Sequence, residues 1–394
     1  MTDKNPWSSL EHNRVFISKL TLTDFRCYQH TQLKLGCDHP LVVLTGPNGA
    51  GKTNILEALS YMAPGRGLRR SSLTDVARQS GPGSWAAAAD LMVGDEMIKI
   101  GTGIEPTPGG ETAKRLVRVD GENAQNSNVL GERWSVGWLT PQMDRLFIEG
   151  PSSRRRFLDR LVLGLFPDHS RQVGAYERVM RERNKLLAEQ GNRADSAWLS
   201  ALEARMAEHG IAAAIARLEF AGQLAGQLDE AEDGPFPKAL LAIDGWLESM
   251  LADGTAPVDA ELAFRERLKT GRMADGSNSR ANVGIHKTDL VVTHAPKNMR
   301  ADLCSTGEQK ALLVALVLAN AKLQAALKGR APLMLMDEVA AHLDIDRRIA
   351  LFEALASLGS QCWLTGTDKS LFEGLSGKAE FFEVSDGKIQ PSGR

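Results

Sequence analysis

The chain has 394 residues, of which 43% are hydrophobic and 24% charged, so it can bury a full core and divide into more than one lobe. No stretch reaches the roughly 18 to 20 uninterrupted apolar residues of a membrane span, and the N-terminal segment lacks a signal-peptide core. We therefore expect a cytoplasmic protein with no membrane partner. The net charge of −2 excludes a histone-like positive coat, so any DNA contact must be local. The four cysteines lack C-x-x-C spacing and paired histidines, which indicates neither a zinc site nor a disulfide framework.

The first half of the chain shows β-strand patterns. Residues 15–45 predict an alternating strand, a turn and a short apolar strand that runs into a glycine-rich loop. Residues 85–120 alternate polar and apolar side chains, with breaks expected at Gly101–Gly103 and Pro108–Gly110 and a hairpin-like Asp120-Gly121. This pattern predicts an antiparallel β-subdomain that covers one side of a nucleotide fold.

From about Pro151 the pattern changes to helical periodicity, which continues through residues 198–228. We expect a loop-rich stretch over residues 253–279, because glycine, proline and asparagine recur there. The prediction is an α/β fold in which an ATPase head is built from both chain ends around an inserted helical arm. Its parts are a first head segment with the β-subdomain (1–150), the arm (151–280) and a second head segment (281–394).

A phosphate-binding loop follows the predicted strand at residues 41–44. Its pattern is G-x-x-x-x-G-K-[ST], and the next residues, starting at Asn54, open a helix, as that motif requires. Backbone N–H groups of such a loop surround phosphates, Lys52 supplies a positive charge, and the Thr53 hydroxyl is a ligand for Mg²⁺. The predicted ATP-binding residues are Gly46, Pro47, Asn48, Gly49, Ala50, Gly51, Lys52, Thr53 and Asn54.

A second short apolar strand, residues 333–336, ends in two carboxylates. Asp337 is expected to hold the Mg²⁺ shell, and Glu338 to orient or deprotonate the attacking water. Upstream, Gln142 follows a strand-like segment and is predicted to touch Mg²⁺ or water, with a plain loop glutamine as the open alternative.

Between these motifs, Ser305 to Gln309 read Ser-Thr-Gly-Glu-Gln and open a long apolar helix. A serine hydroxyl and a glycine backbone at a helix N-terminus suit a γ-phosphate, although an ordinary helix cap would explain the serine alone. The order of the three motifs resembles that of ABC-type ATPases. That resemblance implies that Ser305, Gly307 and Gln309 serve the nucleotide of a second subunit in an ATP-dependent homodimer, and that Asp344 crosses the interface between subunits.

Several segments resemble the RecF family, within the SMC and RecF branch of these ATPases. They include Thr23-Asp24-Phe25-Arg26 before the phosphate loop, Gly65 to Arg70, and Gly150 to Asp159. The resemblance implies that Arg26 reaches the nucleotide. The segment Gly284 to Leu290 departs from the family pattern, because a proline, an arginine and one aspartate are replaced.

Two groups of arginines are candidates for DNA contacts. The first, Arg66, Arg69 and Arg70, is predicted to bind phosphates without reading bases. For the second, residues 154–156, contact with DNA and attachment of the arm to the head both remain open. In either group a solvated face or ion pairs would explain the charges as well.

The resemblance implies a weak, DNA-stimulated ATPase that acts as a switch. It would bind DNA near single-strand gaps or junctions, promote recombinase loading with RecR-like and RecO-like mediators, and serve replication and the SOS response. Its cofactors would be ATP and Mg²⁺. Two alternatives remain: the nucleotide-binding subunit of a transporter, and another SMC-like or nuclease-linked ATPase. Three features argue against a transporter: the Phe25-Arg26 segment before the phosphate loop, the inserted arm and the lack of a switch histidine.

Overall fold

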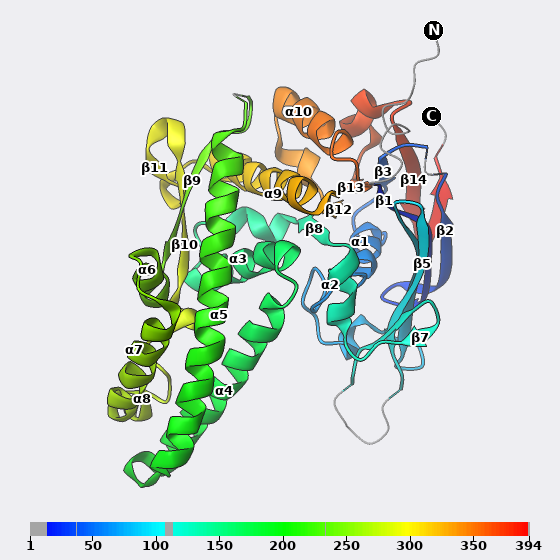
Figure 1. Ribbon diagram of the computed structural model, residues 1–394. Helices are drawn as coiled ribbons and strands as arrows, with labels where there is room; N and C mark the ends of the chain where they lie inside the picture. Colours follow the sequence, from blue (N-terminus) through cyan, green and yellow to red (C-terminus); the bar gives the residue numbers. More distant parts are fainter. Residues whose placement is uncertain (1–13, 37, 107–112, 233, 393–394) are drawn as a thin grey trace. The chain divides into compact units, whose positions relative to one another are not determined.

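The structure is a computed structural model that describes residues 14–36, 38–106, 113–232 and 234–392. The chain forms two compact units, which we call the head unit (Met1–Asp144, Gly234–Phe236 and Leu313–Arg394) and the arm unit (Arg145–Asp233 and Pro237–Leu312). Figure 1 labels their elements. In this division residues 281–312 belong to the arm unit. The predicted division instead places them in the second head segment, because they carry the Ser305 motif. The predicted division by function stays a prediction.

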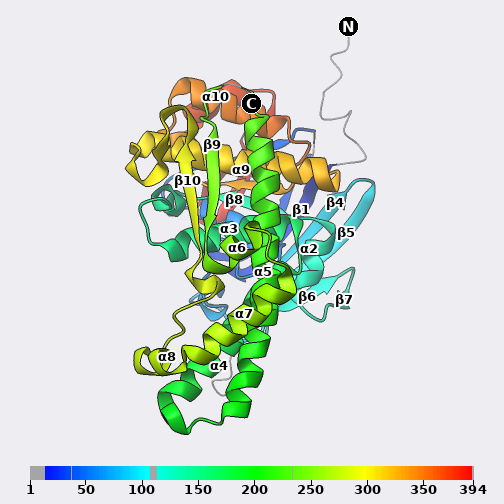
Figure 2. The ribbon, with the colours of Figure 1, turned by 60° about the vertical axis from the view of Figure 1, so that its left-hand side comes forward.

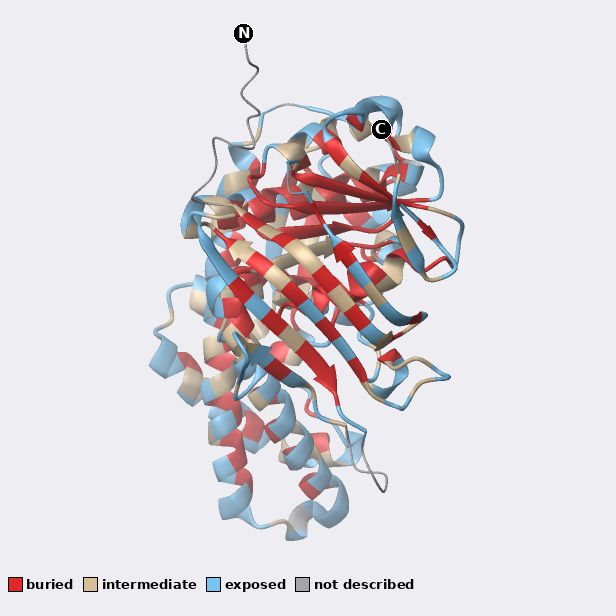
Figure 3. Ribbon diagram, turned by 90° about the vertical axis from the view of Figure 1, so that its right-hand side faces the viewer, coloured by how far each residue is buried: buried red, intermediate tan, exposed pale blue. Residues whose placement is uncertain are grey.

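A six-stranded, mostly parallel sheet forms the centre of the head unit. Its strands β3, β12 and β13 are buried along their whole length, because a parallel sheet is covered on both faces and selects uninterrupted apolar runs. Figure 3 shows these strands as continuous buried segments. The strand order is β15 (Lys388–Pro391), β14 (Ala379–Ser385), β3 (Leu41–Thr45), β13 (Cys362–Gly366), β12 (Leu333–Met336) and β8 (Val136–Leu139), and only β15 pairs antiparallel.

The predicted antiparallel subdomain is a second six-stranded sheet of the head unit. Burial alternates residue by residue along β4, so one face of this sheet joins the head core. The Asp120-Gly121 turn is confirmed, with φ of 51° and 88°. The break expected at Gly101–Gly103 is wrong, because β5 continues through both glycines, and Pro108–Gly110 lies outside the described residues. The order is β2 (Tyr28–Lys34), β1 (Val15–Phe25), β4 (Trp85–Val93), β5 (Glu96–Ile104), β6 (Leu116–Val119) and β7 (Glu122–Asn123).

Short helices complete the head unit. They are α1 (Lys52–Ser60), α2 (Leu130–Arg133) and α10 (Ile345–Ala356), with single 3₁₀ turns at Thr74–Val76, Ser127–Val129, Val339–His342 and Lys369–Leu375. Helix α9 (Thr306–Lys328) is shared in sequence by the two units. It is long and apolar enough to cross a membrane, but 78% of its most apolar stretch is buried inside the protein, as in a core helix.

The arm unit is built on the long helices α4 and α5, which lie side by side (Figures 1 and 2). Tyr176 and Leu187 of α4, within the stretch predicted to be helical, are buried in its core. A three-stranded antiparallel sheet in the order β11, β10, β9 completes the unit. The bounds are α3 (Pro151–Leu165), α4 (His169–Gln190), α5 (Ser196–Asp229), β9 (Ala239–Asp244), α6 (Trp246–Ala252), α7 (Pro257–Thr270), α8 (Arg272–Asn278), β10 (Asp289–His294) and β11 (Met299–Arg300).

The loop-rich stretch expected over residues 253–279 is wrong, because helices α7 and α8 occupy most of it. Ala260, Phe264 and Leu268 recur every four residues along α7 and are buried against the arm core. Pro257 stands at the first turn of α7, where proline is tolerated, and Gly271 follows its last residue. The turn-forming residues therefore mark helix ends rather than a continuous loop.

Buried arginines tie the helices of the arm together. Arg183 of α4 donates to Glu203 Oε1 of α5 at 3.0 Å and to Asp275 Oδ2 of α8 at 2.8 Å. Arg217 of α5 donates to Asp159 Oδ1 at 2.9 Å. Both arginines are almost fully buried and each pairs with two carboxylates, so loss of either guanidinium would leave buried negative charge without its cation.

Candidate nucleotide-binding site

The phosphate-binding loop joins β3 to α1 as the sequence predicts. Gly46 has φ of 145°, and a Cβ there would lie 2.1 Å from the carbonyl oxygen of Val384. Gly51 has φ of 114°, and its Cβ would lie 2.6 Å from the Tyr28 hydroxyl. Only glycine fits either position. Helix α1 begins directly after Gly51 without a side-chain cap, so its N-terminal turn is available for an anion.

Lys52 lies at the start of α1 and turns its ammonium onto the loop itself. Nζ donates to the carbonyl oxygens of Gly46 at 2.6 Å and Pro47 at 2.9 Å. Burial lowers the lysine pKa, and the nearby carboxylates of Glu338 and Asp337 oppose that shift. A phosphate in the loop would give this partly desolvated cation a charged acceptor in place of two neutral carbonyls.

Thr53 and Asp337 meet as expected of a metal site. The Thr53 hydroxyl donates to Asp337 Oδ1 at 3.0 Å, and burial raises the pKa of this carboxyl although two threonine hydroxyls oppose the shift. One hydroxyl and one carboxylate suit Mg²⁺, which usually takes few protein ligands beside phosphates and water. Among the described residues no group of three or more His, Cys, Asp or Glu side chains forms a protein-only metal site.

Thr365 joins this group, although the sequence analysis gave it no role. Its hydroxyl donates to Asp337 Oδ1 at 2.8 Å and accepts from the Glu338 N–H at 2.9 Å. Glu338 has φ of 50°, the left-handed region, so this bond supports a strained residue. The available signal was topological: Thr365 is the last residue but one of β13, which pairs in parallel with β12, the strand that ends just before Asp337.

Gln142 follows β8, the other neighbour of β12. The Asp337 N–H donates to the Leu139 carbonyl oxygen at 2.8 Å, which connects the end of β8 to the start of the carboxylate segment. The Gln142 side chain is exposed, and its predicted contact with Mg²⁺ or water stays a prediction.

Arg26 contacts the helix of the phosphate loop through a carboxylate. Its guanidinium donates to both oxygens of Glu57, at 2.6 and 2.8 Å, and to the Ser71 hydroxyl at 2.6 Å. Glu57 lies on α1 and is fully buried. The hydrogen bond with Glu57 and its charge raise the arginine pKa against the desolvation of the guanidinium. The role of Arg26 toward nucleotide stays a prediction.

The three arginines predicted to bind DNA differ in their surroundings. Arg69 donates to Glu57 Oε2 at 3.0 Å and to the side-chain oxygen of Asn54 at 2.8 Å, so it links the irregular segment after α1 back to that helix. All three arginines are exposed. The bonds to Glu57 and Asn54 hold the Arg69 guanidinium beside α1 while the residue stays at the surface.

The other arginine group bonds within the arm unit. Arg154 donates from Nε and Nη2 to the two oxygens of Asp289, at 2.8 and 2.7 Å, and Arg155 donates to the Thr288 carbonyl oxygen at 2.7 Å. Arg156 contacts the Ser153 hydroxyl at 2.8 Å. The segment from Gly284 to Leu290 departs from the family pattern, but it keeps Asp289, which accepts both hydrogen bonds from Arg154.

The Ser-Thr-Gly-Glu-Gln segment belongs to the arm unit and starts α9. Ser305 donates to Glu308 Oε2 from both its N–H and its hydroxyl, each at 2.9 Å, and the Glu308 N–H donates back to Ser305 Oγ at 3.4 Å. This is a reciprocal capping box. Gly307 has open space around its Cβ position, and Gln309 is buried and donates to the Cys304 carbonyl oxygen at 2.8 Å.

Asp344 caps α10 of the head unit. Its Oδ1 accepts from the Arg347 N–H at 2.9 Å, while 55% of the side chain is exposed. The local role is that of a helix cap. A role across a subunit interface stays a prediction, as does the corresponding role of Ser305.

Comparison with known proteins assigns these features to one family. A family model described as the RecF/RecN/SMC N terminal domain matches residues 16–390. The DNA replication and repair protein RecF of Rhizobium rhizogenes is 47% identical over 96% of this chain and 100% of that protein. RecF of Brucella suis is 48% identical over 96% of each chain. The solved structure of the recombination mediator protein RecF bound to ATPrS has a TM-score of 0.82 and 19% identity over 97% of this chain and 100% of that one, a likeness of fold.

Proposed function

Because the chain belongs to the RecF family, we propose that it is an ATP-dependent DNA-binding protein of replication, recombination and repair. The expected head with an inserted arm is confirmed by its likeness to RecF structures. We place its action in the cytoplasm, on DNA near single-strand gaps or junctions, where it promotes recombinase loading with RecR-like and RecO-like mediator proteins and contributes to the SOS response.

One observation carries the ATP site: three separate segments meet at the carboxyl ends of β3, β12 and β13. Thr53, Asp337 and Thr365 are linked by hydrogen bonds of 3.0 and 2.8 Å, although more than 280 residues separate the first from the second. Ligands of parallel α/β sheets bind at this edge of the sheet. The open N-terminus of α1 and the ammonium of Lys52 lie in the same loop.

The residues divide the work as follows. Lys52 binds and charge-stabilises the β- and γ-phosphates, while Thr53 and Asp337 hold Mg²⁺, which neutralises phosphate charge when bound. Thr365 keeps Asp337 and the Glu338 backbone in place. Glu338 orients or deprotonates the attacking water, and Gln142 contacts the metal or that water. Hydrolysis is slow and serves as a switch.

ATP also controls association. Ser305, Gly307 and Gln309 of one subunit bind the γ-phosphate held by the other, and Asp344 crosses the interface. The dimer then presents Arg66, Arg69 and Arg70 to DNA phosphates. Because these contacts read no bases, duplexes of different sequence should bind alike and binding should weaken steeply with salt.

Size-exclusion chromatography tests the proposal directly. The protein is run with ATP, ADP or no nucleotide, each with and without a gapped duplex, beside Lys52→Ala as the control. We expect a dimer with ATP, but not with ADP or without nucleotide. The protein should co-elute with DNA only when ATP is present. A monomer under all conditions, or equal DNA binding without nucleotide, would contradict the ATP-controlled clamp.

A further inference from the structure

The segment between α1 and the 3₁₀ turn at Thr74–Val76 carries the three DNA-directed arginines but contains no helix or strand. Irregular backbone leaves carbonyl groups that need donors from elsewhere. In this segment, side chains from other parts of the head unit supply them. Arg115 bonds three of these carbonyls, those of Tyr61, Ala63 and Gly65.

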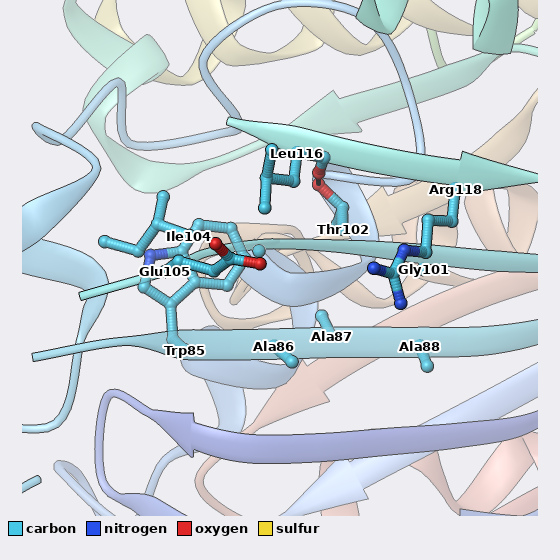
Figure 4. A pocket seen from close by; sticks show the side chains of 11 residues that line it. Trp85, Ala86, Ala87, Ala88, Gly101, Thr102, Ile104, Glu105, Leu116 and Arg118 are labelled. Carbon is cyan, nitrogen blue, oxygen red and sulfur yellow. Dashed lines mark hydrogen bonds between the residues drawn. The ribbon is translucent and has the colours of Figure 1, made fainter. Parts of the chain in front are cut away.

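The three carbonyls accept from one guanidinium. Arg115 Nη1 donates to Gly65 O at 2.8 Å and to Ala63 O at 3.2 Å, Nη2 donates to Tyr61 O, and Nε donates to the Thr102 hydroxyl at 2.8 Å. Thr102, beside Leu116 in Figure 4, donates in turn to the Leu116 carbonyl oxygen at 3.1 Å. The fork of the guanidinium thus joins strands β5 and β6 to the start of the basic segment.

Among the residues that the structure describes, the hydrogen-bond partners of Arg115 are neutral oxygens. Burial lowers its pKa to about 10, and the nearby Tyr61 opposes that shift only weakly. The guanidinium also lies 5.3 Å from the centre of the Tyr61 ring, a cation–π contact. The guanidinium is desolvated and donates to four oxygens in a fixed fork, an arrangement that a compact ammonium could not reproduce.

Two tryptophans hold the same segment in the same way. Trp134 Nε1 donates to Met62 O at 2.7 Å, and Trp85 Nε1 donates to Leu73 O at 2.8 Å. At its far end, Arg69 is fixed on Glu57. Arg66 and Arg70 therefore sit on a backbone that is anchored on both sides of them.

We propose that Arg115 is a positioning residue that holds the basic segment, residues 61–73, in the shape in which Arg66 and Arg70 contact DNA phosphates. This role rests on the proposed DNA function. Arg115 itself points into the protein and contributes no phosphate contact of its own. The antiparallel sheet thereby acts as the support of the DNA-contacting segment.

The matched control is Arg118, three residues further along the chain, in β6. It is exposed, donates to Asn123 Oδ1 at 3.0 Å within the β6–β7 hairpin, and borders the shallow hollow of Figure 4. Arg115→Ala and Arg118→Ala remove the same charge from neighbouring positions of the chain. A difference between them therefore reports the anchoring of the segment rather than net charge.

The test combines amide hydrogen exchange of residues 61–73 with fluorescence-anisotropy titration of a duplex at several salt concentrations, in the presence of ATP. Arg115→Ala should speed exchange in this segment, lower DNA affinity about tenfold and flatten the salt dependence. Arg115→Lys should fall between Arg115→Ala and wild type, and Arg118→Ala should match wild type. ATP binding, measured with a fluorescent analogue, should be unchanged in all three.

Unchanged exchange in Arg115→Ala would overturn the positioning role, and so would faster exchange with wild-type DNA affinity and salt dependence. If Arg115→Ala does not fold, Thr102→Val provides the second variant, because it removes the acceptor of Arg115 Nε while keeping the side-chain volume. Thr102→Val should speed exchange, lower DNA affinity and flatten the salt dependence as Arg115→Ala does, but by smaller amounts. Failure of the wild-type protein itself to bind duplex would overturn the DNA function, which separates the two outcomes.

Discussion

Helices α1 and α9 both begin at segments expected to meet phosphate, but their N-termini are satisfied differently. At α1 the preceding residue is Gly51, which offers no side-chain cap. At α9 Ser305 and Glu308 cap each other through three hydrogen bonds. The first helix end is open to an anion within its own chain, whereas the second already has an internal carboxylate in contact with the serine.

A serine at a helix N-terminus can therefore cap its own helix, as Ser305 does here, before any phosphate binds there. If Ser305 binds a γ-phosphate of another subunit, its hydroxyl must leave Glu308, whose carboxylate would otherwise face the phosphate. Lys297 pairs with Glu308 and screens part of that charge. In the proposed dimer the α9 site would form only on association, whereas the uncapped end of α1 is present in the single chain.

Lys52→Ala should give the largest effect, because it removes the cation at the α1 end. A charge-assisted hydrogen bond contributes roughly 1.5–3 kcal/mol, so ATP affinity should fall at least about tenfold and ATP-dependent dimers should disappear. Nucleotide titration and light scattering measure the two quantities. Wild-type dimer formation in this variant would remove the basis for the phosphate-loop assignment.

Ser305→Arg should block dimerisation while ATP binding to the monomer stays normal. A bulky cation at the α9 end fills the space meant for the other subunit's phosphate but does not touch the nucleotide of its own chain. Ser305→Ala is the matched control, since loss of the cap alone costs roughly 0.5–2 kcal/mol of stability. If both variants form ATP-dependent dimers as well as wild type does, Ser305 is a helix cap only.

Glu338→Gln should slow ATP hydrolysis by about 100-fold or more, the usual scale of general-base catalysis, with ATP binding intact. Asp337 and Thr53 remain in place, so Mg²⁺ is still held and the dimer should persist longer than in wild type. A phosphate-release assay beside the dimer measurement checks this. Hydrolysis at the wild-type rate would show that Glu338 is not the catalytic carboxylate.

The smallest effect concerns the cap of α9. The ion pair with Lys297 and the bonds from Ser305 lower the pKa of Glu308 from its ordinary 4.5 to about 2. Its stabilising contribution is therefore fully present above pH 4.5 and is lost as the pH falls toward 2. The difference in melting temperature between wild type and Glu308→Gln should shrink across this window. Glu189→Gln, at an exposed pair of α4, should show no comparable trend.

The contiguous parts of the site could be predicted from the sequence, because the phosphate loop and the Asp337 segment each carry their chemistry within a few residues. Thr365 could not, since its role depends on the pairing of β13 with β12. The same limit applies to Arg115, whose three carbonyl acceptors lie 50 to 54 residues away. In the fold, helix α7 was missed because turn residues at its ends masked a short apolar stripe, and helix α8 has no such stripe to predict it.

A mixing experiment tests most directly the central claim that two helix ends from different subunits share one nucleotide. Lys52→Ala and Ser305→Arg chains are combined with ATP, and association is measured by light scattering. The mixture can rebuild one composite site, with Lys52 from the Ser305→Arg chain and Ser305 from the Lys52→Ala chain. The account predicts partial recovery of ATP-dependent dimers that neither variant forms alone. Normal dimers of Ser305→Arg by itself would contradict it.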